Sequence, residues 1–431
     1  MLKDDRNPKA LAALPDEALI EAVQRQTFRY FWDGADAASG LALDRRTLVG
    51  ATGEDKADER VAIGGTGFGV MALIVAVERG WVTRDAALDR LRRMLDALFR
   101  ARRYHGAFPH FMDGASGETI PMSPKDDAGD LVETSFLMMG LLCLRQYFGG
   151  DTAAERRLRS DIDTLWHEVE WNWFTQGGRD VLYWHWSPNH GFAMNHEVHG
   201  WNECLITYLM AAASPRHAID PRVYHRGYAS GPDFLNGRSY YGIELPLGAP
   251  YGGPLFFTHY SFCGLDPHGL KDRYADYWDL NGRHVRVNRA HCIANPKGFK
   301  GYGESCWGLT ASDDPDGYLA HDPNTDNGTI SPTGALASLP YAPAEAMQVL
   351  RHFLTVHGTR LWRDYGFVDA FCEQRGWFAE TFLAIDQGPI VVMMENHRTG
   401  LLWKLFMSVP EVQAGLRALD FESPHLGAPA P

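Results

Sequence analysis

Three carboxylates between residues 126 and 133 have a spacing that could serve acid–base chemistry. The run PKDDAGDLVETSF over residues 124–136 places Asp126, Asp130 and Glu133 four and then three residues apart. On a helix, side chains at these intervals lie on one face, where like charges repel each other. The structural alternative is that Asp126 and Asp127 cap the helix while Glu133 faces solvent. Because a helix N-terminus favours ionised carboxylates, we expect bases or water-holding groups here if these residues act in catalysis.

Glu203 is the candidate general acid. It belongs to HEVHGWNECLITYL over residues 196–209, and we expect it in the first turn of an apolar helix beside Trp201. Apolar and aromatic surroundings raise the pKa of a carboxyl, so that it holds a proton near neutral pH. The alternative is a glutamate that caps the start of this helix. His196 and His199 are only three residues apart, which does not match the HExxH zinc motif.

A third acidic candidate precedes an apolar helix near the C-terminus. The run AIDQGPIVVMMENHRTGLLWK over residues 384–404 places Asp386 before a helix that Pro389 opens. We expect Asp386 to contact substrate. Glu395 and Arg398 are three residues apart on this helix and are interpreted either as a buried ion pair or, for Arg398, as a substrate-binding residue.

The run GYGESCWGLTASDDPDGY over residues 301–318 resembles the wall of a sugar subsite. It places Glu304 and Trp307 in an irregular loop, where an acid and a flat ring could contact a sugar. The next residues partly match a calcium-binding loop, but Gly328 comes one position late and Thr333 stands where a bidentate glutamate is required. We therefore predict no metal and no other cofactor.

Composition favours a neutral ligand. The 431 residues carry a formal net charge of -13, and no basic stripe is present, so nucleic acids and anionic membranes are poor candidate partners. The 13 Trp and 17 Tyr residues, many of them in Gly-rich stretches, suit stacking on sugar rings. The six cysteines form no CxxC pair, which indicates free thiols. Neither a GxSxG elbow nor a Walker A sequence occurs.

Helical periodicity dominates the chain, and alternating strands are nearly absent. The predicted helices cover residues 17–32, 66–79, 84–101, 130–148, 154–168, 200–213, 277–294, 329–339, 343–357 and 389–407. This pattern predicts an all-α toroid of inner and outer helices in a single domain over residues 1–431, with peripheral tails at 1–15 and 413–431. The long loops at 102–127, 172–199, 214–260 and 295–328 are expected to form the walls of one cleft.

The cleft residues that we expect to bind substrate are mostly aromatic or polar side chains of these loops. They are Trp184, His185, Trp186, Trp201, His259, Tyr260, Glu304, Trp307, Asp386 and Arg398. The N-terminal sequence MLKDDRNPKA contains no apolar segment. The chain as it stands is therefore expected to be cytoplasmic, or periplasmic if an export signal precedes it. The sequence does not determine the oligomeric state.

Five segments together resemble the bacterial glycoamylase-like proteins, in particular the branch of β-1,2-glucanases. They cover residues 66–83, 130–136, 200–203, 301–313 and 385–404. The resemblance implies an (α/α)6 barrel and an inverting hydrolysis of β-1,2-linked glucan or its oligosaccharides. Glu203 would then be the general acid, and Asp126, Asp130 and Glu133 would supply the base and position water.

Two other classes of function remain open from the sequence. A disaccharide phosphorylase or epimerase could use the same toroid, but phosphorolysis requires a cationic pocket, for which Arg398 and Lys404 are the local candidates. A non-catalytic sugar-binding protein would keep the aromatic rings without a paired acid and base.

Overall fold

The computed structural model describes residues 7–48 and 60–427, and these residues are mostly helical. The α-helices are α1 Pro8–Ala12, α2 Asp16–Trp32, α3 Ile63–Glu78, α4 Arg84–Arg100, α5 Leu131–Tyr147, α6 Ala153–Glu168, α7 Leu205–Ala213, α8 Tyr277–Ala294, α9 Pro332–Leu336, α10 Pro343–His352, α11 Ala384–Thr399, α12 Leu401–Met407 and α13 Pro410–Ala418. Short π-helical turns cover Tyr224–Tyr228 and Phe353–His357. Among the described residues, no helix has the length and apolar character needed to cross a membrane.

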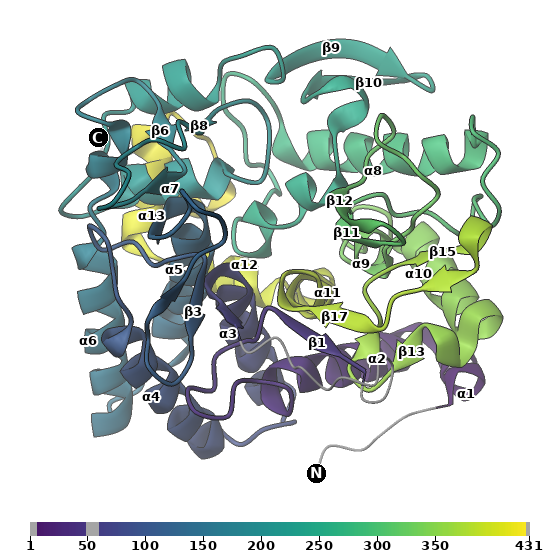
Figure 1. Ribbon diagram of the computed structural model, residues 1–431, viewed down its shortest axis with the longest axis horizontal. Helices are drawn as coiled ribbons and strands as arrows, with labels where there is room; N and C mark the ends of the chain where they lie inside the picture. The colour runs from purple at the N-terminus through teal and green to yellow at the C-terminus, as the bar shows by residue number, and fades with distance from the viewer. Residues whose placement is uncertain (1–6, 49–59, 428–431) are drawn as a thin grey trace.

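The helices form an inner and an outer set. Helices α3, α5, α7 and α11 are buried almost all round, because apolar residues occupy every face. Helices α4, α6 and α10 bury one apolar stripe and expose a charged face. In Figure 1, α11 lies at the centre of the view and α6 at its edge. Helix α3 packs between α5 and α11, and α2 packs against both α3 and α11.

Glycines bring α3 and α5 into backbone contact. A Cβ atom on Gly67 would lie 2.2 Å from the carbonyl oxygen of Phe136, and one on Gly140 would lie 2.2 Å from the carbonyl oxygen of Gly67. Neither position can therefore carry a larger residue without moving a helix. The glycine-rich run at residues 64–69 lies within the first two turns of α3. This contact holds the starts of both helices side by side.

The strands are short and tie loops together. They are β1 Arg45–Thr47, β2 Arg60–Ala62, β3 Phe111–Asp113, β4 Thr119–Ile120, β5 Gly129–Asp130, β6 Leu182–Tyr183, β7 His185–Trp186, β8 Glu197–Val198, β9 Leu235–Tyr240, β10 Ile243–Leu247, β11 Ala311–Asp314, β12 Gly317–Ala320, β13 Trp362–Arg363, β14 Gly366–Phe367, β15 Phe371–Cys372, β16 Trp377–Phe378 and β17 Thr381–Leu383. Strands β2, β3 and β4 form one antiparallel sheet, and the other strands pair in twos, including β5 with β7 and β11 with β12.

Several predicted boundaries were wrong. The helix predicted at 200–213 begins only at Leu205, and the helix predicted at 389–407 begins at Ala384 and is interrupted at Gly400, which has a φ of 67°. The segment 413–431 is no peripheral tail over its described part, because α13 packs against α7 and Phe421 is buried. The described part of segment 1–15 likewise forms α1 and buries Leu11. Residues 1–6 and 428–431 of these segments lie outside the described residues.

Candidate active site

A cavity of about 520 Å³ opens where α3, α5 and α11 begin. Four of the residues that the sequence singled out line it: Glu133, Trp184, Glu203 and Tyr260. Each comes from a different segment of the chain, so only the fold brings them together. The cavity is the candidate active site because it combines buried carboxyl groups with aromatic rings.

Glu203 holds a proton near neutral pH. It lies in the turn just before α7 and not in the helix itself, and its main-chain carbonyl accepts a hydrogen bond from the Ser261 hydroxyl. The residue is only 9% exposed. Burial, reinforced by the nearby Glu133 carboxyl, raises the pKa of Glu203 to about 7. The expected apolar surroundings are therefore present, although the expected helical position was wrong.

Asp130 organises one side of the cavity. It is fully buried and caps α5, its Oδ1 accepting the main-chain N–H of Glu133 at 2.9 Å. Its Oδ2 accepts the indole N–H of Trp184 at 3.0 Å and lies 3.0 Å from Nδ1 of His110. The sequence had proposed Asp126 and Asp127 as capping residues. Asp130 takes this role because α5 begins only at Leu131.

Glu133 and Asp126 complete this group, which we call the α5 cluster (Asp126, Asp130 and Glu133). Glu133 Oε2 accepts the main-chain N–H of Gly64 at 2.6 Å, and burial raises its pKa above the ordinary value. Burial, followed by repulsion from Asp130, raises the pKa of Asp126 to about 6. Asp126 lies in the loop before α5, so the three carboxylates do not share one helical face as the spacing had suggested. His185 lies 3.4 Å from Asp126.

A second acidic group, the α11 cluster (Asp313, Asp369 and Asp386), lies beside the same cavity. Asp386 is in the first turn of α11, and neither of its carboxyl oxygens receives a hydrogen bond from a nitrogen or hydroxyl donor of the described residues. Asp369 Oδ2 accepts the main-chain N–H of Asp313 at 2.7 Å, and both oxygens of Asp313 lie 3.1 Å from Nη1 of Arg45. Burial and the neighbouring carboxyl groups raise the pKa of both Asp386 and Asp369.

Three predicted substrate residues belong to the protein interior. Trp307 and Trp201 are 0% and 2% exposed, and the Trp201 ring packs against Tyr277 with its centroid 5.5 Å away. His259 is buried and forms a 2.9 Å hydrogen bond with Ser338. These side chains fill the protein core and cannot stack on a sugar, contrary to their predicted role in substrate binding.

One other predicted substrate residue, Arg398, lies elsewhere. Arg398 contacts Glu17 and Glu21 of α2, each at 3.1 Å, while Glu395 pairs with Arg79 at 2.8 Å. The predicted Glu395–Arg398 pair and the predicted substrate role of Arg398 were therefore both wrong. The partners of these side chains come from α2 and α3, which sequence spacing along α11 could not indicate.

Three further predicted residues do not line the cavity. Glu304 is exposed on its loop. Trp186 is half-buried and packs edge-on against Trp173 and His105, with ring centroids 5.7 and 4.7 Å away. His185 is buried behind Asp126, where its Nε2 accepts the main-chain N–H of Ala128 at 3.2 Å.

Sequence reasoning missed many residues that line the cavity. They are Asp44, Arg45, Arg60, His110, Phe111, Met122, Phe136, Phe256 and Tyr318. Arg60 lies over the ring of Phe111 at 4.6 Å, and Tyr318 extends from β12 with 52% of its surface exposed. Phe136 and Tyr318 end the quoted runs at 124–136 and 301–318, and no motif marks the other residues. The FPHF run at 108–111 is the one local signal, since it places polar His110 among apolar residues in a loop predicted to be functional.

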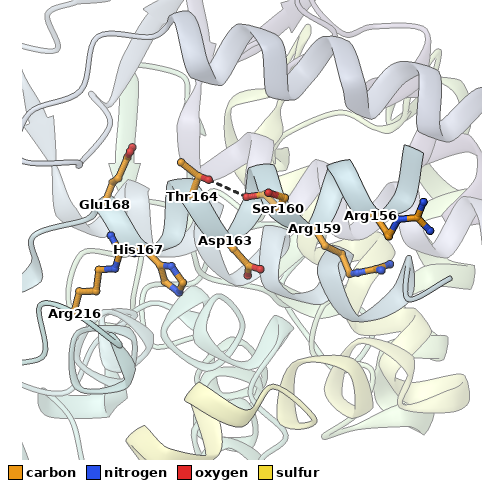
Figure 2. A pocket seen from close by; sticks show the side chains of 8 residues that line it. All are labelled: Arg156, Arg159, Ser160, Asp163, Thr164, His167, Glu168 and Arg216. Carbon is orange, nitrogen blue, oxygen red and sulfur yellow. Dashed lines mark hydrogen bonds between the residues drawn. The ribbon is translucent and has the colours of Figure 1, made fainter. Parts of the chain in front are cut away.

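A second hollow, of about 460 Å³, lies on the outer face of α6. Figure 2 shows its charged side chains along that helix, with Arg216 approaching from another segment. None of the residues predicted to be catalytic lines it. Within residues 7–48 and 60–427, no group of three or more His, Cys, Asp or Glu side chains is arranged to hold a metal ion.

The mostly helical fold and an acidic, aromatic cavity define a class of carbohydrate-active protein. Residues 195–410 match the Glycoamylase family, described as "Putative glucoamylase". The chain belongs to this family. It is 52% identical to an endo-β-1,2-glucanase of Chitinophaga pinensis solved with sophorotriose and glucose, with a TM-score of 0.92 and coverage of 96% of this chain and 100% of that chain.

Two further relatives support this assignment. The "putative glucoamylase" structure from Bacteroides uniformis is 55% identical, with a TM-score of 0.92, and covers 96% of this chain and 99% of that one. The exo β-1,2-glucooligosaccharide sophorohydrolase (non-reducing end) of Parabacteroides distasonis is 44% identical over 94% of this chain. The chain spans 58% of the length of that curated relative.

Proposed function

We propose that this chain is a glycoside hydrolase that cleaves β-1,2-linked glucan or its oligosaccharides with inversion, in a single (α/α)6 barrel domain. One observation carries the proposal. Glu203, with a pKa raised to about 7, shares a cavity with Glu133 of the α5 cluster. A proton donor and an acidic group that can activate water are the two components that glycoside hydrolysis requires. Two relatives are named as enzymes that act on β-1,2-linked glucans.

The proposed mechanism uses only side chains and water. Glu203 donates its proton to the glycosidic oxygen as the bond from that oxygen to C1 breaks. A water attacks C1 from the opposite face, and a carboxylate of the α5 cluster accepts its proton. Inversion needs space for this water, with the two carboxyl groups roughly 6.5–9.5 Å apart. Asp130, held by its hydrogen bonds, would position Trp184 and the first turn of α5.

The cavity wall suits a neutral, kinked sugar chain. A β-1,2-linked chain bends at each linkage, so its rings cannot all lie on one flat surface. Trp184, Phe111, Tyr260 and Tyr318 line the cavity from separate segments and could contact successive rings at different orientations. Asp386 does not line the cavity and both its carboxyl oxygens are buried, so its predicted contact with substrate stays a prediction.

The two arginines of the cavity favour hydrolysis over phosphorolysis. Arg45 is held by both oxygens of Asp313, and Arg60 lies 3.8 Å from Asp44. Carboxylates therefore already neutralise these two arginines. The earlier phosphate candidates, Arg398 and Lys404, do not line the cavity. A phosphorylase would need an arginine or lysine that is available to phosphate.

Replacing Glu203 with glutamine tests this function. Glu203→Gln keeps the size of the side chain but removes the proton donor, so turnover of sophorotriose and longer oligosaccharides should fall by about two orders of magnitude or more while binding persists. Glu244→Gln, an exposed glutamate on β10, is the matched control and should be fully active. NMR of the first product should detect the α-anomer. Near-wild-type turnover in Glu203→Gln, or efficient hydrolysis of starch by the wild type, would contradict the proposal.

A further inference from the structure

His110 has a fixed place in the cavity wall. Its main-chain carbonyl accepts the N–H of Ile63 at the start of α3, and the next residue, Phe111, begins β3. The imidazole lines the cavity and keeps 22% of its side-chain surface exposed. Both the backbone and the ring are therefore held where a bound sugar would lie.

The two ring nitrogens of His110 have different surroundings. Nδ1 lies 3.0 Å from Oδ2 of Asp130, a buried carboxylate that also accepts hydrogen bonds from Trp184 and from the main chain of Glu133. Asp130 can only accept when ionised, so Nδ1 carries a proton and donates it. Nε2 has no hydrogen-bond partner within the described part of the chain. It is thus available to a ligand.

Charges around His110 favour its protonated form. Burial would lower its pKa, but the carboxylates of Glu133, Asp130 and Asp126 outweigh burial and raise the pKa to about 10. These acids approach from α5 and from the loop before it. Arg60 of β2, the strand paired with β3, lies over the neighbouring Phe111 ring at 4.6 Å. His110 is consequently a cation throughout the neutral pH range.

We propose that His110 is a further substrate-binding residue, whose Nε2–H donates to a hydroxyl oxygen of the glucosyl unit held beside the α5 cluster. This inference rests on the proposed glucan hydrolysis. The same positive charge stabilises the ionised carboxylates of the cluster. Two consequences can be separated: loss of the donor weakens sugar binding, and loss of the charge raises the pKa of the neighbouring acids.

Two substitutions distinguish these roles from a purely structural one, in which His110 only holds the Asp130 side chain in place. In His110→Asn, the amide can still donate to Asp130 from the position of Nδ1 but does not reach the position of Nε2. The longer side chain of His110→Gln can place a donor near that of Nε2. We expect KM for sophorotriose to rise about tenfold to hundredfold in His110→Asn, with a smaller change in kcat, and to recover partly in His110→Gln.

The pH profile supplies a second readout. Both substitutions remove the cation, so the acidic limb of kcat/KM should move up by about one pH unit, because the base of the α5 cluster then remains protonated to higher pH. His268→Asn is the matched control: His268 forms a similar 2.8 Å contact with Asp266 but does not line the cavity. This variant should retain the wild-type KM and pH profile.

Calorimetric binding separates this inference from the proposed function. Sophorotriose binding is measured in Glu203→Gln, with and without His110→Asn, and the double variant should bind about tenfold more weakly or worse. Wild-type KM, affinity and pH profile in His110→Asn would overturn the inference, since support of Asp130 alone predicts that result. A wild-type protein that neither binds nor cleaves sophorotriose would instead overturn the proposed function.

Discussion

The α5 cluster and the α11 cluster both place buried acids beside one cavity, but the hydrogen-bond donors around Asp130 and Asp386 differ. In the α5 cluster, Asp130 accepts hydrogen bonds from the Glu133 main chain and from Trp184, and it contacts His110. In the α11 cluster, Asp386 receives no such donor within the described residues and lies beside Asp369, another buried carboxyl. Both Asp130 and Asp386 lie at the start of a helix, so the helix dipole does not account for the difference.

The comparison shows that hydrogen-bond donors limit how far burial raises the pKa of a carboxyl group. Glu133 and Asp369 each accept a main-chain N–H and have pKa values raised to about 7, whereas Asp386 accepts none from the described residues and has a pKa raised well above its ordinary value. Within the α5 cluster, Asp126 has a pKa raised only to about 6 and can supply a base, whereas Asp386 holds its proton more tightly and does not line the cavity. The next three predictions test this difference.

The largest effect is expected for Asp130→Asn. The asparagine oxygen can still cap α5, but its NH2 group would face the donors of Trp184 and His110. We expect the free energy of unfolding to fall by about 2 kcal/mol and turnover to fall about 100-fold. Urea unfolding and steady-state kinetics measure these effects. Asp316→Asn, at an exposed ion pair with Arg375, is the control and should change neither. A fully stable and active Asp130→Asn would show that the donors are not needed.

The pH dependence of activity should be a narrow bell. The pKa of Asp126 is raised to about 6 and that of Glu203 to about 7. If Asp126 is the base, kcat/KM is lost below about pH 6 as it gains a proton, and above about pH 7 as Glu203 loses its proton. The profile is measured with sophorotriose from pH 4 to pH 9. Activity that stays constant to pH 9 would contradict the assignment of Glu203 as the acid.

The smallest effect is expected for Asp386→Asn, which mimics the protonated acid. Because folding raises the pKa of Asp386, the folded state binds its proton more tightly than the unfolded state does. Its contribution to stability is therefore lost as the pH rises above about 4, the ordinary value for aspartate. Asp386→Asn should match or exceed the wild-type free energy of unfolding at pH 7, by at most about 1 kcal/mol, and should weaken its pH dependence. Destabilisation at pH 7 would indicate an ionised, partnered Asp386.

Patterns within one element were predicted better than contacts between elements. The periodicity of α4, α5, α6 and α8 located these helices to within one or two residues, because each carries its own apolar stripe or run and its own capping residue. The start of α7 was placed five residues early, because the turn that holds Glu203 is fixed by Ser261 from another segment. Trp307 was assigned to a cleft loop, yet its ring is buried, since loop residues can also fill the core.

The helical class, the candidate carboxyl groups and the family resemblance could all be predicted from the order of residues along short segments, where spacing and neighbouring side chains act directly. The packing of distant segments places His110 and Arg45 in the cavity wall and Asp369 beside it, keeps Arg398 and Trp307 out of it, and shifts the pKa values of the buried acids. Donors and cations that set a buried pKa come from segments tens to hundreds of residues apart, and their proximity exists only after the helices have packed.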